Sequence, residues 1–102
     1  MSDILWQPTA ERIASTQLAA WQQWLASDQG LVFDSYADLH QWSVTHREEF
    51  WKSIWNYFGI NSHSPYRAVL ENDVMPGASW FPGATLNFAE HLLRYRDNRT
   101  AL

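Results

Sequence analysis

Residues 45–59 read THREEFWKSIWNYFG, and this stretch decides the fold class. Thr45 and Glu48 have the spacing of a capping box, which predicts that a helix starts at Thr45. Large apolar side chains then recur at helical intervals along one broad stripe, at Phe50, Trp51, Ile54, Trp55 and Phe58. Gly59 suits the left-handed position that follows the last turn of a helix. The stretch therefore predicts an amphipathic helix.

Helical patterns also precede this stretch. Thr9 can act as an N-cap, and the apolar stripe that follows predicts one continuous helix that stops at Gly30. The stripe consists of Ala14, Leu18, Trp21 and Leu25. A second, short helix is expected from Ser35, which pairs with Asp38 in a capping-box-like spacing. We therefore interpret residues 9–58 as helical.

Residues 59–85 are rich in turn formers. Pro82 and Gly83 suit the two central positions of a type II turn, because proline fixes φ and glycine accepts a positive φ. Residues 68–70, Ala-Val-Leu, have room for one short strand. This part of the chain is expected to be a turn-rich connection.

A last helix is expected over residues 87–96, with Asn87 as N-cap and Glu90 three residues later. The expected fold is mainly α, with about four helices and the turn-rich, short-stranded segment at 59–85. The 102 residues have the length of one domain, so a single domain over 1–102 is expected.

Composition excludes several classes of partner. The formal net charge is −4, and the seven lysines and arginines are scattered, so we expect binding to neither nucleic acid nor an anionic membrane. The chain contains no cysteine, which excludes disulfides and thiolate metal sites. No apolar run approaches the ~20 residues of a membrane span, and the first residues lack the pattern of a signal peptide. A cytoplasmic protein is expected.

The residues that could carry chemistry do not form a known pattern. The four histidines, at positions 40, 46, 63 and 91, include no pair at the i, i+4 spacing that suits a metal ion on a helix. Ser62-His63-Ser64 offers a nucleophile and a base but no adjacent carboxylate, so a loop is the favoured interpretation. The four glycines are isolated and cannot form a phosphate-binding loop. We predict no catalytic, cofactor-binding or metal-binding residue.

The aromatic residues allow two interpretations. Trp21 with Trp24, and Trp51 with Trp55, could form a stacking platform for a base or a sugar. The same residues recur at helical spacing beside aliphatic side chains, which favours core packing. A third interpretation is an independent all-α module that binds a protein or a small apolar ligand through its surplus aromatic side chains.

Several segments together resemble the N-terminal region of acetoacetyl-CoA synthetases, and the resemblance covers nearly the whole chain. The most specific pattern is Trp-Phe-x-Gly-x-x-Leu-Asn at residues 80–87, which acetyl-CoA synthetases share in a slightly different form. Tyr-x-x-Leu-x-x-Trp-Ser-Val at residues 36–44 favours the acetoacetate branch, and a fragment of an acetyl- or propionyl-CoA synthetase is the alternative. The remaining segments are Leu5-Trp6-Gln7-Pro8-Thr9, Phe50-Trp51 and Ile54-Trp55.

The resemblance implies the N-terminal lobe of a larger α/β ligase. Such an enzyme activates a short carboxylic acid with ATP and Mg²⁺ to an acyl-adenylate, releases pyrophosphate, and transfers the acyl group to coenzyme A. The family's phosphate loop, ribose-binding Asp and catalytic Lys lie downstream of the matched region, so no catalytic residue is carried over. The catalytic ATP-binding domain is expected to be absent from these 102 residues, which are expected to be inactive by themselves.

The resemblance also implies a docking role. The expected partner is the remainder of the ligase, and the isolated chain is expected to form a homodimer that covers the same surface. The candidate interface residues are Trp80, Phe81, Pro82, Gly83, Leu86 and Asn87.

Overall fold

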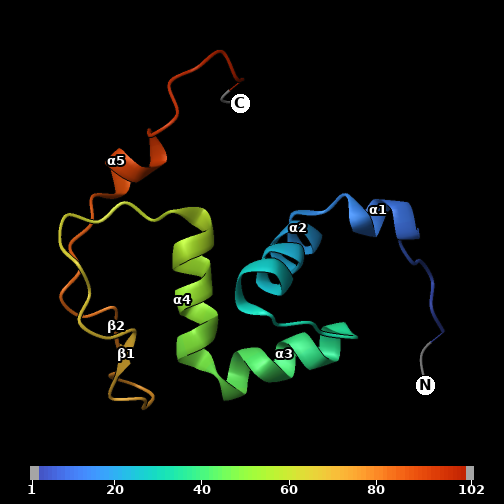
Figure 1. Ribbon diagram of the computed structural model, residues 1–102, viewed down its shortest axis with the longest axis horizontal. Helices are drawn as coiled ribbons and strands as arrows, with labels where there is room; N and C mark the ends of the chain where they lie inside the picture. Colours follow the sequence, from blue (N-terminus) through green and yellow to red (C-terminus); the bar gives the residue numbers. More distant parts are fainter. Residues whose placement is uncertain (1–2, 101–102) are drawn as a thin grey trace. The chain divides into compact units, whose positions relative to one another are not determined.

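The computed structural model describes residues 3–100. It is mostly helical, which confirms the expected fold class. The described chain forms two compact units, one ending at Thr45 and the other beginning at His46 (Figure 1). The single domain over 1–102 stays a prediction, and we describe each unit by itself.

The first unit begins with three consecutive helical segments instead of the one continuous helix expected up to Gly30. These segments are α1 (Ala10–Ala14), α2 (Gln17–Trp24) and a π-helical stretch, η1 (Leu25–Gln29). Thr9 caps α1 as predicted, because its side chain accepts a hydrogen bond from the Arg12 backbone N–H. Gly30 ends η1 with φ +68°, also as predicted.

The break between α1 and α2 has a local cause. The hydroxyl of Ser15 donates to the carbonyl of Arg12 at 2.8 Å, and the hydroxyl of Thr16 donates to the carbonyl of Ile13 at 2.7 Å. The Thr16 Oγ1 then accepts from the backbone N–H of Ala19 and caps α2. Hydroxyl side chains compete with the helical backbone in this way, so two such residues in succession favour a new start over a continuous helix.

The first unit ends with α3 (Tyr36–Thr45), which starts as predicted after Ser35. The Ser35 hydroxyl accepts from the backbone N–H of Asp38 at 3.2 Å. Trp21, Leu25 and Leu39 are the buried apolar side chains described in this unit. The Trp42 ring lies 6.5 Å from that of Trp21, so α3 and α2 meet through their aromatic side chains.

The second unit begins with the longest described helix, α4 (Arg47–Phe58). The prediction that Thr45 caps this helix is wrong, because His46 is the N-cap and Thr45 is the last residue of α3. The Thr45 hydroxyl donates back to the carbonyl of Gln41 at 2.8 Å. Thr45 therefore closes the preceding helix, although the sequence pattern places it at the start of the following one. Gly59, with φ +58°, ends α4 as predicted.

The turn-rich segment contains the short strands β1 (Leu70–Glu71) and β2 (Ser79–Trp80). They pair antiparallel, with Leu70 opposite Trp80 and Glu71 opposite Ser79. The strand expected at residues 68–70 thus lies slightly later in the chain. The turn between the strands carries Asp73, whose carboxylate accepts a hydrogen bond from the Arg47 guanidinium at the start of α4. This hydrogen bond, together with the charge of Asp73, raises the pKa of Arg47.

The last helix, α5 (Phe88–Leu92), is shorter than the expected 87–96. Asn87 caps it as predicted, and its Oδ1 accepts from the backbone N–H of Glu90 at 3.0 Å. The N–H of Leu93 donates to the carbonyl of Ala89, and the helix ends there.

Candidate docking surface

The Trp-Phe-Pro-Gly segment is held along residues 63–69 by backbone hydrogen bonds. The N–H of Phe81 donates to the carbonyl of Val69 at 2.8 Å, and the N–H of Arg67 donates to the carbonyl of Pro82 at 2.9 Å. The N–H of His63 donates to the carbonyl of Thr85 at 2.7 Å. These bonds fix the turn to the neighbouring strand-like segment.

The Pro-Gly step makes the turn that the sequence predicts. The N–H of Ala84 donates to the carbonyl of Phe81 at 3.2 Å, and Gly83 has φ +96°. A Cβ atom at Gly83 would lie 3.3 Å from the carbonyl oxygen of Pro65. Glycine is thus favoured here by its backbone conformation and by the close approach of a neighbouring chain segment.

Three rings meet where this turn contacts α4. The ring of Phe81 stacks on Trp55 with a centroid distance of 4.5 Å and an interplanar angle of 26°. Tyr66 contacts both rings edge-on, with centroid distances of 5.2 Å to each. We call Trp55, Tyr66 and Phe81 the aromatic block. Phe81 therefore packs inside the unit on residues that are 26 and 15 positions away in sequence.

Trp80 takes a more open position. Its ring contacts Trp51 edge-on, with a centroid distance of 5.8 Å, and 44% of the residue remains exposed. Trp51, Trp80 and Phe81 line a shallow groove of about 340 Å³. The groove is apolar and opens to the surface, so it could accept one large apolar side chain.

The other expected interface residues divide between internal and exposed positions. Pro82 is half-buried, and Gly83 is at the turn. Asn87 is occupied as the cap of α5. Leu86 is 53% exposed. Of the six, Trp80 and Leu86 therefore combine an apolar side chain with substantial exposure.

The side of α5 that faces its own unit is polar. Nε2 of His63 lies 2.7 Å from Oε2 of Glu90, and the backbone N–H of Asn61 donates to Nδ1 of His91 at 3.4 Å. Just beyond the helix, the Arg94 guanidinium donates to the carbonyl of Phe58 at 2.8 Å. Arg94 thereby places a positive charge at the C-terminus of α4, where the helix dipole favours it.

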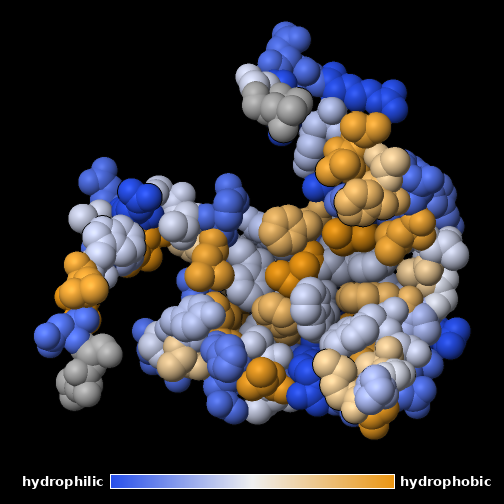
Figure 2. Space-filling view, turned by 180° about the vertical axis from the view of Figure 1, so that it is seen from behind, coloured by the Kyte–Doolittle hydropathy of each residue, from blue (hydrophilic) through white to orange (hydrophobic). Residues whose placement is uncertain are grey.

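The apolar side chains of α5 are exposed. Phe88 is 82% exposed, Leu92 65% and the adjacent Leu93 62%. Figure 2 shows apolar side chains reaching the surface in several places on the face that it draws. The usual arrangement, with the apolar side of a helix turned inward, is reversed in α5.

Two sets of residues that could suggest catalysis have structural contacts. The hydroxyl of Ser64 donates to the carbonyl of Gly83 at 2.6 Å and lies 3.1 Å from Oγ1 of Thr85. His63 has an acidic partner, Glu90, which the sequence pattern does not reveal because 27 residues separate the two. Ser64 Oγ and the His63 ring thus point to different partners, and the arrangement closes the turn instead of activating a nucleophile.

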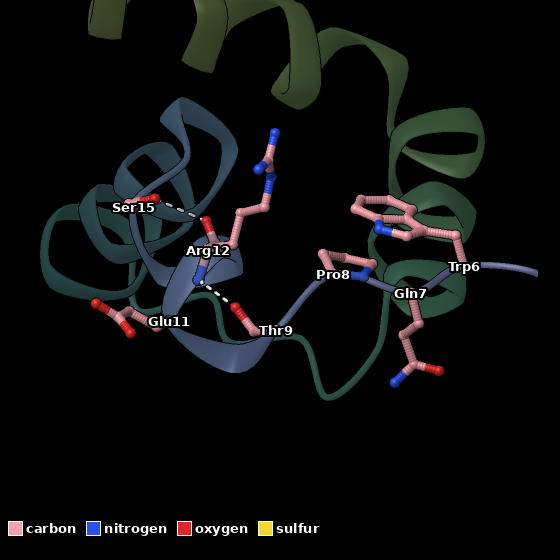
Figure 3. A pocket seen from close by; sticks show the side chains of 7 residues that line it. All are labelled: Trp6, Gln7, Pro8, Thr9, Glu11, Arg12 and Ser15. Atoms are coloured by element: carbon pink, nitrogen blue, oxygen red, sulfur yellow. Dashed lines mark hydrogen bonds between the residues drawn. The ribbon is translucent and has the colours of Figure 1, made fainter.

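A second hollow lies in the first unit, next to α1 (Figure 3). It measures about 400 Å³, and its lining includes Trp6 and Arg12, with the guanidinium carbon 6.0 Å from the ring centroid. The Thr9 and Ser15 hydroxyls on its wall are hydrogen-bonded to the backbone N–H and carbonyl of Arg12. The wall is therefore shaped chiefly by the way α1 begins and ends.

Residues 3–100 contain neither a metal-binding cluster nor a membrane-spanning helix. Within this range, no group of three or more His, Asp or Glu side chains is placed to hold a metal ion. Over the same residues, no helix is long and apolar enough to cross a membrane.

Comparison with known proteins identifies the family. The family described as acetyl-coenzyme A synthetase N-terminus matches residues 36–92, which is more than half of the chain. The malonamoyl-CoA synthetase of Penicillium aethiopicum is 42% identical over 93 residues, covering 89% of this chain and 13% of that protein. The acetoacetyl-coenzyme A synthetase of Rhizobium meliloti (strain 1021) is 36% identical over 98 residues, covering 96% of this chain and 15% of that protein.

A solved structure, the acetoacetyl-CoA synthetase from Streptomyces lividans, matches with a TM-score of 0.85 and 47% sequence identity. The match covers 91% of this chain and 15% of that chain. This chain thus spans 13–15% of the length of the relatives named here. The resemblance inferred from the residues is confirmed: the chain belongs to the acetyl-coenzyme A synthetase N-terminus family, with acetoacetyl-CoA synthetases among its relatives.

Proposed function

We propose that this chain serves as the N-terminal region of an acetoacetyl-CoA synthetase-like ligase. The whole enzyme would convert acetoacetate, ATP and coenzyme A to acetoacetyl-CoA, AMP and pyrophosphate, with Mg²⁺ bound to ATP. The observation that carries the proposal is the match to the S. lividans enzyme, with 47% identity and a TM-score of 0.85. The ATP, Mg²⁺ and coenzyme A sites would lie in the part of the ligase beyond this region.

The role of these residues in the ligase is docking, without a catalytic contribution. The groove at Trp51 and Trp80 and the exposed Leu86 support this role, because open apolar surface marks a site of protein contact. Phe81, Pro82, Gly83 and Asn87 would contribute indirectly, by fixing the turn and starting α5. The partner is the remainder of the ligase.

On this proposal, the region does not select the carboxylic acid that the ligase activates. A malonamoyl-CoA synthetase and acetoacetyl-CoA synthetases share it at similar levels of identity, 42% and 36%. A region that is common to enzymes named for different acids is better suited to a structural role than to substrate selection.

A pyrophosphate-release assay tests whether the chain is inactive without the rest of the ligase. The isolated chain is mixed with acetoacetate, ATP, Mg²⁺ and coenzyme A, with the S. lividans enzyme as the positive control. We expect release from the control and none from the chain. Sustained release by the chain at a rate above the buffer blank would overturn the docking role.

We further propose that the isolated chain forms a homodimer. Many of its large apolar side chains are exposed, and a second copy can cover them when the ligase is absent. Sedimentation velocity at tens of micromolar is expected to show a species of twice the monomer mass. A monomer over that range would contradict the homodimer and leave the ligase assignment unaffected.

A further inference from the structure

We infer that α5 is the main docking helix of this region and that its outward side, formed by Phe88 and Leu92, packs against the body of the ligase. This inference rests on the proposed function and identifies the surface that carries it. It shifts the centre of docking from the Trp-Phe-Pro-Gly turn to the helix that follows.

The polarity of α5 is reversed with respect to its own unit. Glu90 and His91 contact the segment that follows α4, through His63 and the backbone of Asn61. Phe88 and Leu92 are four residues apart and therefore lie on one side of the helix. Because the polar residues hold the helix to its own unit, the exposed apolar residues are left for a partner.

α5 is held to its own unit at two places. Oε2 of Glu90 lies 2.7 Å from Nε2 of His63, and Arg94, just past the C-terminus of α5, donates to the carbonyls of Phe58 and Gly59 at 2.8 and 3.1 Å. These contacts restrict rotation of the short helix about its axis. The apolar side is thus presented in a defined direction, which lowers the entropic cost of docking.

The length of the relatives indicates that the ligase body covers the apolar side of α5. In the S. lividans relative, the matched region is 15% of the chain, so most of that enzyme lies outside it. A body that is covalently joined to the region is present at an effective concentration in the millimolar range, which favours it over a second copy or an unrelated protein. We therefore assign the apolar side of α5 to the ligase body.

The test uses a full-length enzyme in which this chain replaces the matching region of the S. lividans synthetase. The docking variant carries Phe88→Glu and Leu92→Lys. A negative charge in the first turn and a positive charge in the last turn both agree with the helix dipole, so the substitutions remove the apolar side without opposing the helix. The matched control is Met75→Glu, which removes a 95% exposed apolar side chain of the same unit outside α5.

The readouts are limited proteolysis of the grafted region and pyrophosphate release with acetoacetate. Loss of docking raises the fraction of molecules in which the grafted region is detached from the ligase body and accessible to the protease. We therefore expect cleavage to become about tenfold faster in the double variant, with unchanged cleavage for Met75→Glu. Circular dichroism of the same substitutions in the 102-residue chain is expected to match that of the unsubstituted chain.

The possible failures separate the two proposals. If the unsubstituted hybrid has no synthetase activity, the proposed function is contradicted, and the assignment of α5 falls with it. If the hybrid is active but the double variant is cleaved no faster than Met75→Glu, the assignment of α5 is overturned and the proposed function stands. If both variants are cleaved faster to the same extent, docking is spread over the unit and α5 is not its centre.

Discussion

The aromatic block and α5 belong to the same unit and are both rich in large apolar side chains, yet they use them in opposite ways. In the aromatic block, the rings of Trp55 and Phe81 stack on each other within the unit. In α5, Phe88 is exposed and makes no ring contact that is described, whereas Glu90 pairs with His63 of the same unit. In this region, an apolar residue is therefore not necessarily buried.

The difference lies in the chemical groups that each segment contacts within the unit. Residues 79–85 form backbone hydrogen bonds with residues 63–69. This pairing brings the Phe81 ring onto Trp55 of α4. Opposite α5 lie the imidazole of His63 and the backbone N–H of Asn61. Polar groups on one side select polar side chains of the helix, and the apolar ones turn away.

Trp55→Ala should have the largest effect, because it removes the contacts with both Phe81 and Tyr66. We expect the free energy of unfolding to fall by about 2–4 kcal/mol, less than for a fully buried tryptophan because Trp55 is half-buried. Urea denaturation followed by circular dichroism measures the change. Trp51→Ala, at the exposed edge of the groove, is the control and should cost clearly less; equal losses would show that the block is not the centre of packing.

Gly83→Ala should have the next largest effect. The positive φ and the approach of the Pro65 carbonyl together predict a loss of about 1–3 kcal/mol in the free energy of unfolding. Gly77→Ala is the matched control, because Gly77 also has a positive φ but no atom within 4 Å of the position that a Cβ atom would take. Because both glycines have a positive φ, the difference between the two variants reports mainly on the close approach at Gly83, and a zero difference would contradict its importance.

Asn87→Ala should weaken α5 without changing its apolar side. Loss of the hydrogen bond to the Glu90 N–H is expected to cost about 1 kcal/mol in the local stability of the helix. Amide hydrogen exchange of residues 90–93 by NMR measures this loss. Asn87→Asp keeps an acceptor at the same position and should retain the slow exchange; equally fast exchange in both variants would argue against the cap.

Glu90→Gln should have the smallest effect. The pair with His63 is more than half exposed on both sides, so its contribution is expected to be at most a few tenths of a kcal/mol. The difference from the unsubstituted chain in urea denaturation should shrink further in about 1 M salt. A loss above about 1 kcal/mol that persists in high salt would mean that this pair contributes more to α5 than its exposure indicates.

Local signals predict the structure correctly where the responsible residues are neighbours in sequence. Thr9, Ser35 and Asn87 cap the helices that their spacing predicts, and Gly30 and Gly59 end helices at positive φ. Several predicted boundaries are wrong. The first helix breaks at Ser15 and Thr16, where Thr16 caps a new helix, and Thr45 belongs to the helix before it. The last helix is shorter than expected, and the strand lies slightly later in the chain.

The candidate site is only partly accessible to sequence reasoning. The Trp-Phe-Pro-Gly pattern identifies the segment and the family, and its interface role stays a prediction. The contact of Phe81 with Trp55 and the pairing of Glu90 with His63 join positions 26 and 27 residues apart, for which one sequence offers no signal.

The sequence by itself determined the helical class, most of the helix ends and the family, because caps, glycine positions and the 80–87 motif depend on residues close together in the chain. Only the tertiary structure decided which apolar side chains face inward. That choice depends on the groups across from each segment, and for α5 those groups are the imidazole of His63 and the backbone N–H of Asn61. The same physical rule that packs Phe81 inside the unit thus leaves Phe88 outside it.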